Sequence, residues 1–253
     1  MNIRTTLITS SLIAASLVSG AAHAALQGRD LNGSAGSFEA YYDTDLDITW
    51  LADANYGAGS IYDDISYYGG TTTDGLMTWA AANTWAAQLS FYNPLTNQTV
   101  DDWRLPTTTG TGAPGAQCTL SSTDCGHNVD PTSSEVAHLY FTELGNLSTF
   151  TASGAESGSY FGGANPESSL DNTGPFTNFE SGAYWSGTEY ELNPLLAWYF
   201  EPGNGVQTFN EKTFSLYALA VRPGDVAAVP EAQTYALMLA GLGLIGWRAR
   251  RRG

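Results

Sequence analysis

Basic residues are scarce in this 253-residue chain, which holds 9 Lys and Arg against 25 Asp and Glu. The formal net charge is −16 at pH 7, and an acidic field of this strength repels phosphate backbones. The composition therefore argues against nucleic acid, and equally against sulfated or strongly anionic glycans, as partners. Acidic surfaces keep exported proteins soluble, and they also attract cations such as Ca²⁺.

Cysteine is nearly absent as well, with only two residues in the chain. Cys118 and Cys125 lie seven positions apart in a loop that contains Gly and Ser. In an oxidising compartment, such a pair is most simply a local disulfide that pins its loop. A metal site at this loop would need more ligands than Asp124 and His127 provide.

Patterns typical of catalysis are also missing. The chain has no Gly-x-Ser-x-Gly nucleophile elbow, and the glycines of residues 110–115 match a dinucleotide-binding pattern without a helix after them. Paired acids at residues 63–64 and 101–102 would point to opposite faces of a strand. We therefore expect no enzymatic activity, no catalytic residue and no cofactor apart from calcium, and we keep an extracellular polysaccharide hydrolase as the alternative.

The first 24 residues have the layout of a secretory signal peptide. Arg4 precedes a mostly apolar stretch at residues 7–18, and Ala22-His23-Ala24 offers the small residues that signal peptidase reads. Cleavage after Ala24 would start the mature protein at residue 25.

The last 25 residues, 229–253, form a second sorting signal. Its apolar stretch, at residues 235–247, is short for a permanent span of roughly 20 residues, so an ordinary membrane anchor is the alternative. The tail resembles the PEP-CTERM signal of Gram-negative bacteria, although Ala232 stands where that family usually has proline. The resemblance implies transient inner-membrane anchoring, processing by exosortase, and delivery to the cell surface or extracellular matrix. The residues of the motif and the basic terminus are Val229, Pro230, Glu231, Ala232, Arg248, Arg250, Arg251 and Arg252.

Residues 25–228 form the single exported domain between the two signals. Hydrophobic patterning and capping residues predict two helices, at residues 77–89 and 133–144, the first capped by Asp74 and the second by a Thr132–Glu135 capping box. Alternation and turn residues predict short strands among long loops. These strands are two within residues 38–51, one at 101–107, and others at 183–186, 196–201, 206–209 and 215–221. The fold class expected from these elements is α+β.

Motifs in order along residues 40–225 resemble the Lcl C-terminal-domain-like family, a domain of unknown function. They include Thr49-Trp50-Leu51, Trp103-Arg104-Leu105-Pro106-Thr107, Ser134-Glu135-Val136, Tyr184-Trp185-Ser186-Gly187, Ala197-Trp198 and Val221-Arg222-Pro223-Gly224. The resemblance implies a C-type-lectin-like domain with two helices against short antiparallel strands. The formylglycine-generating enzymes share the Arg-Leu-Pro-Thr strand, but their reactive cysteine pair is not matched here.

The family resemblance and the spacing of acidic residues suggest two candidate sites. In a lectin-like domain, Tyr184, Trp185, Glu189 and Trp198 would line a glycan-binding face, although six tryptophans outside the tail also suit a core. Asp43, Asp45 and Asp47 place oxygen ligands at alternate positions, as in a calcium loop, but the following Gly and Glu of an EF-hand are missing. The alternative is a solvated acidic turn beside a strand.

The function expected from the sequence is a non-enzymatic surface or exopolysaccharide-matrix protein that binds glycan in adhesion or biofilm structure. The alternative of a different class is a purely structural matrix protein that binds nothing specific.

Overall fold

The computed structural model describes residues 26–34, 36–63, 73–109, 118, 120, 123–157, 170 and 172–226. The predicted signal peptide, residues 1–24, and the predicted sorting signal, residues 229–253, lie outside this part of the chain. Within the described residues, no helix has the length and the apolar character needed to span a membrane.

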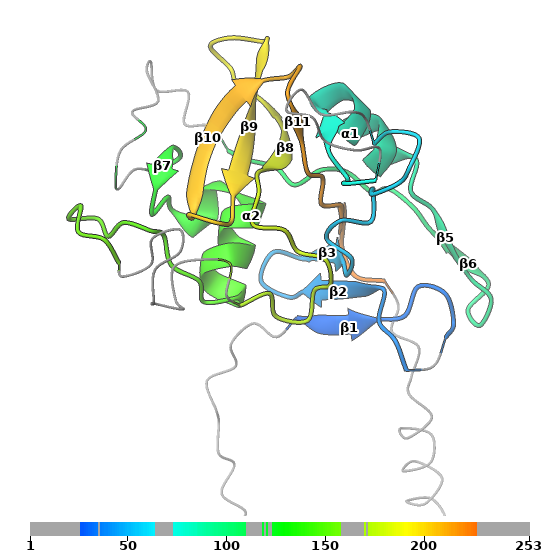
Figure 1. Ribbon diagram of the computed structural model, residues 1–253. Coiled ribbons are helices and arrows are strands. Elements are labelled where there is room, and N and C mark those ends of the chain that lie inside the picture. The colour runs from blue at the N-terminus through cyan, green and yellow to red at the C-terminus, as the bar shows by residue number, and fades with distance from the viewer. Residues whose placement is uncertain are drawn as a thin grey trace, which may run out of the picture.

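The first sheet brings together both ends of the described chain (Figure 1). It contains β1 (Gln27–Arg29), β2 (Ala40–Asp43), β3 (Ile48–Leu51) and β12 (Val221–Pro223), antiparallel and in that order. The β2–β3 hairpin pairs Asp43 with Ile48 and confirms the two strands that were predicted around an acidic turn. Asp47 adopts a positive φ of 51° there, a conformation that Asp tolerates better than most residues.

The second sheet has the order β7-β10-β9-β8 and is also antiparallel. Its strands are β7 (Gly126–His127), β8 (Tyr184–Glu189), β9 (Leu196–Glu201) and β10 (Val206–Glu211). The β9–β10 hairpin pairs Val206 with Glu201 and confirms the predicted turn, because Gly205 supplies the positive φ of 64° that the turn needs.

Two smaller strand pairs complete the sheets. The strands β4 (Met77–Thr78) and β11 (Ser215–Leu216) form one pair, and β5 (Phe91–Asn93) and β6 (Gln98–Val100) form a hairpin that was not predicted. The strand predicted at residues 101–107 is wrong, because this segment makes only the single bridge Arg104–Val221. Pro106, which carries no amide hydrogen, limits further pairing.

Helices are few and short in the described chain. The helix α1 (Trp79–Ala87) begins at Thr78, whose hydroxyl accepts from the amide of Ala81, so the predicted cap at Asp74 is wrong. A 3₁₀ turn, η1 (Pro131–Ser133), leads into α2 (Glu135–His138), which is followed by one π-helical turn, η2 (Leu139–Glu143). The predicted Thr132 cap is also wrong, because the hydroxyl of Ser134 caps α2.

The core is divided into two main clusters. One surrounds α1 and includes Leu51, Trp103 and Trp185. The other surrounds α2, which lies between the two four-stranded sheets (Figure 1), and includes Trp50 and Phe200. The aromatic residues therefore join the sheets to the short helices.

The predicted fold class, a C-type-lectin-like α+β domain, is wrong. Strands in antiparallel sheets dominate the described chain, and both α-helices are short. The physical reason lies in the second predicted helix. Its apolar spacing continues to Leu144, but the α-helical hydrogen bonding ends after four residues and a π turn takes over.

Candidate functional site

The aromatic residues predicted to bind glycan are part of the core. Tyr184 is 1% exposed, and Trp185 and Trp198 are fully buried. The Trp185 indole donates to the carbonyl of Met77 at 2.9 Å, and burial raises the pKa of the Tyr184 hydroxyl. These rings cannot stack on a sugar from solvent, so the prediction is wrong for all three.

The fourth residue of that prediction, Glu189, is on the surface. Its side chain is 54% exposed and forms an ion pair with Lys212 at 2.5 Å. Lys212 also lies over the ring of Trp79, 4.2 Å from its centre. Glu189 is therefore exposed and paired with a neighbouring cation, unlike the buried aromatic residues with which it was grouped.

The acidic turn does not gather its three carboxylates around one point. The Asp43 Oδ1 atom accepts from the backbone amides of Asp45 and Leu46 at 3.0 and 3.1 Å. The Asp47 Oδ1 atom accepts from the hydroxyl of Tyr42 at 2.8 Å. The structure therefore does not bring together the three ligands predicted for calcium, and the oxygens of Asp43 and Asp47 take part in hydrogen bonds that build the turn.

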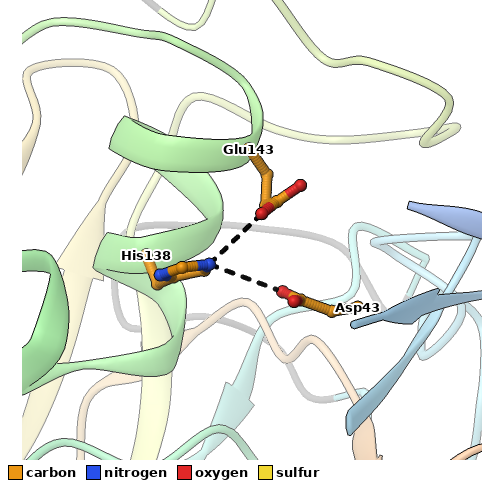
Figure 2. A group of neighbouring side chains, drawn as sticks. All are labelled: Asp43, His138 and Glu143. Carbon is orange, nitrogen blue, oxygen red and sulfur yellow. Dashed lines mark hydrogen bonds and ion pairs between the residues drawn. The ribbon is translucent and has the colours of Figure 1, made fainter. Parts of the chain in front are cut away.

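Asp43 instead lies near two residues of the continuous segment formed by α2 and η2 (Figure 2). Asp43, His138 and Glu143 each offer one potential ligand atom, and these three atoms lie within 4.8 Å of one another. Among the described residues, this is the one group of three or more side chains that could hold a metal ion. The Nε2 atom of His138 is 3.2 Å from Glu143 Oε1 and 3.9 Å from Asp43 Oδ2. The three side chains are buried, with 0% of Asp43, 11% of His138 and 2% of Glu143 exposed.

The π turn explains how His138 and Glu143 come together. Residues five apart point in different directions on an α-helix, whose turn is 3.6 residues. In η2, the amide of Leu144 bonds to the carbonyl of Leu139, five residues earlier, at 2.9 Å, and this wider turn places position i+5 over position i. The sequence pattern does not reveal the His138–Glu143 pair, because regular α-helical spacing would put these two residues on different faces of the helix.

The electrostatics of the cluster are unfavourable for two charged carboxylates. Burial, and then the nearby charge of Asp43, raise the pKa of the Glu143 carboxyl, while the hydrogen bond to His138 acts in the opposite direction. A single imidazole thus faces two buried acidic groups.

A separate groove of about 480 Å³ lies near the end of β3. Its volume falls within the range of roughly 300–1,000 Å³ that is usual for small-ligand sites. Phe38 and Tyr56, which are 48% and 47% exposed as whole residues, line it. Tyr56 is 5.7 Å from the ring of Phe91, which is partly buried against the core.

Polar groups flank these rings. The groove is also lined by Asn32, Glu39, Asp53 and Thr177. Glu39 accepts from the amide of Leu31 at 3.0 Å and from the hydroxyl of Ser37 at 2.7 Å. The sequence does not reveal this groove, because the lining residues come from segments as distant as residues 32 and 177 and form no local pattern.

Cys118 and Cys125 form a disulfide. Cys125 is fully buried beside Trp198 and Tyr190, and Gly126 directly after it begins β7. The bond therefore ties a loop to the edge of the second sheet.

A comparison with known families identifies one motif. Residues 228–252 match the PEP-CTERM protein-sorting motif, and the match includes Ala232 in place of the usual proline. Neither the curated proteins nor the solved structures contain a match to this chain. The motif shows that the chain is exported, is held as a membrane-anchored precursor, is processed by exosortase and is sorted to the cell surface.

Proposed function

We propose that this chain is a non-enzymatic protein of the cell surface or exopolysaccharide matrix that binds a neutral glycan in the groove beside β3. The observation that carries the proposal is the pair of exposed rings, Phe38 and Tyr56, set among carboxylate and amide groups in a hollow of about 480 Å³. The sorting motif at residues 228–252 indicates delivery to the cell surface, where exopolysaccharide would be within reach.

The chemistry of the groove suits a sugar ring. The apolar face of a pyranose packs on an aromatic ring, and its hydroxyls donate to carboxylates and amide oxygens. Tyr56 and Phe38 supply the apolar surface, and Glu39, Asp53 and Asn32 supply acceptors. Half-exposed rings lose little conformational freedom on binding, because each has only two rotatable side-chain bonds.

Charge favours a neutral glycan over an acidic one. Residues 25–230 hold 4 basic residues against 24 acidic ones, a net charge of −20. Glu39 and Asp53 add two carboxylates to the groove itself. A uronate or sulfate group placed there would be repelled.

The carboxylates of the groove are better suited to binding a glycan than to cleaving its glycosidic bonds. Both oxygens of Glu39 already accept hydrogen bonds within the fold, and Asp53 accepts from the backbone amide of Asn55 at 3.0 Å. These contacts support a non-enzymatic role, and the hydrolase alternative is tested by measuring release of reducing ends.

A relationship to the Lcl C-terminal-domain-like family is also part of the proposal. It is supported by the order of the motifs along residues 40–225. Trp185 and Trp198 are fully buried, and Arg104 holds Glu135 through two hydrogen bonds of 2.7 Å. Such residues would preserve a fold while leaving the groove free to vary.

The full chain, purified in mild detergent, should bind neutral bacterial exopolysaccharide saturably in calorimetry. Tyr56→Ala should weaken binding roughly 5- to 30-fold, because one stacked ring contributes on the order of 1–2 kcal/mol. The matched control is Tyr92→Ala, since Tyr92 is 57% exposed and is not among the lining residues. An equal loss in both variants would mean that the groove is not the binding site. No binding by the unaltered chain would leave a purely structural matrix protein as the better account.

A further inference from the structure

The turn that contains Asp43 does not account for the nearby positions of His138 and Glu143. Sequence positions 43 and 138 are joined only by the fold, which sets the end of β2 against α2 and η2 (Figure 2). The three ligand atoms converge within 4.8 Å, so a single small ion could touch all of them.

We propose that Asp43, His138 and Glu143 bind one divalent metal ion of the zinc class. The binding atoms are Asp43 Oδ2, His138 Nε2 and one oxygen of Glu143. This site is independent of the glycan groove and shares no residue with it.

The ligand distances are compatible with a zinc ion. Zinc bonds to imidazole nitrogen and carboxylate oxygen are about 2.0–2.2 Å long, so two ligands on one ion lie roughly 3.4 Å apart in a tetrahedron. The His138–Glu143 and His138–Asp43 separations are 3.2 and 3.9 Å. Zinc binding would need the Asp43 Oδ2 atom to move about 0.5 Å closer to His138 Nε2 to reach this separation.

The donor set points to the same class of ion. One imidazole and two carboxylates form a borderline ligand set that zinc-like ions accept. Calcium prefers six to eight oxygen ligands, and neither Asp45 nor Asp47 belongs to this group. Three protein ligands leave a fourth position for water.

Asp43 is held in place before any ion arrives. Its Oδ1 atom accepts from the amides of Asp45 and Leu46, and the Trp50 indole donates to its Oδ2 atom at 3.3 Å. Contacts of this outer kind orient a metal ligand and restrict its rotation. The π turn fixes His138 and Glu143 in the same way, because it is built by backbone hydrogen bonds.

The test is zinc binding by the full chain after chelator treatment, measured by calorimetry. We expect one tight site per chain and a rise in the thermal unfolding midpoint when zinc is added. His138→Gln and Glu143→Gln should each weaken the tight site at least about tenfold, since a lost ligand costs no less than a lost outer contact. The matched control is His127→Gln, because His127 lies against Phe150 and outside the cluster.

X-ray absorption of the zinc-loaded chain gives a readout that does not depend on variants. It should show nitrogen and oxygen ligands at about 2.0–2.2 Å. Weak binding of many ions, as expected of any acidic surface, would overturn the proposal. So would a tight site that persists in both cluster variants, that prefers calcium, or that is lost equally in His127→Gln, because zinc binding would then not depend on this cluster.

Discussion

At the scale of single residues, Arg104 shows how one side chain joins distant segments. Its guanidinium donates to both oxygens of Glu135 at 2.7 Å, and the backbone amide of Thr107 donates to the same carboxylate at 2.6 Å. The pair connects the segment after β6 to the first residue of α2. Because Arg104 and Glu135 are 34% and 15% exposed, the pair should contribute more than a surface ion pair does.

We therefore predict that Arg104→Lys lowers the free energy of unfolding by about 1–3 kcal/mol, because lysine cannot form the two parallel hydrogen bonds. Urea unfolding followed by tryptophan fluorescence measures the change. Arg222→Lys is the control, since Arg222 donates to backbone carbonyls near the surface. A loss in Arg104→Lys no larger than in the control would mean that the pair is only a surface contact.

His127 gives a prediction about pH. Burial lowers its pKa from the usual 6.5, against the opposing effects of Asn204 and Glu201. The unfolded state then binds more protons than the folded state between the two pKa values. The contribution of the neutral His127 ring to the free energy of unfolding is therefore fully present above about pH 6.5. This contribution is lost as pH falls through the folded-state pKa of His127.

His127→Gln should remove this part of the pH dependence. We expect the unaltered chain to lose stability as pH falls below about 6.5, and the variant to lose less over the same interval. Unfolding midpoints in urea at a series of pH values give the comparison. Parallel curves for the two proteins would show that the ring is not desolvated.

At the scale of elements, a comparison of two glycines distinguishes the cost of backbone strain from the cost of a steric clash. Gly205 and Gly145 have nearly the same positive φ, 64° and 66°. A Cβ atom on Gly205 would lie 2.8 Å from the Cα atom of Ser148, whereas nothing lies within 4 Å of one on Gly145. Only the first position is therefore closed to a side chain.

Gly145→Ala should cost about 1–2 kcal/mol from the left-handed conformation alone. Gly205→Ala should cost roughly 1–3 kcal/mol more, because the β9–β10 turn must move away from Ser148. Denaturant unfolding of both variants measures the difference. Equal costs would show that the turn relaxes freely.

The elements also show what could be predicted from the sequence. The hairpins β2–β3 and β9–β10 were predicted correctly because strand alternation and turn chemistry are local properties. The second helix was predicted too long and too regular, because residues 139–143 carry helical spacing but adopt a π turn that no propensity marks. The caps were misplaced by a few residues because Thr78 and Ser134 compete with nearby Asp74 and Thr132 for the same role.

The candidate sites depend on long-range contacts and were therefore largely beyond prediction. Composition indicated that most tryptophans would be buried, but it could not separate Trp185 and Trp198 in the core from Phe38 and Tyr56 at the groove. Asp43 was singled out for cation binding, yet its partners His138 and Glu143 come from another element.

At the scale of the whole molecule, charge is the dominant feature. Residues 25–230 carry 4 basic residues, which can neutralise at most four of 24 carboxyl groups. Three of them, Arg29, Arg104 and Lys212, already form ion pairs. Most of the acidic charge is therefore uncompensated and repels itself in the compact state.

Salt should consequently stabilise this protein. The screening length falls from about 30 Å at 0.01 M to about 3 Å at 1 M, so repulsion among separated carboxylates weakens, while the closer, partly buried ion pairs are screened less. We predict that the thermal unfolding midpoint of the full chain rises with NaCl over this range, as measured by circular dichroism. Sucrose, an uncharged stabiliser excluded from protein surfaces, is the control for effects other than screening. A midpoint that falls with salt would mean that the three ion pairs contribute more than the repulsion costs.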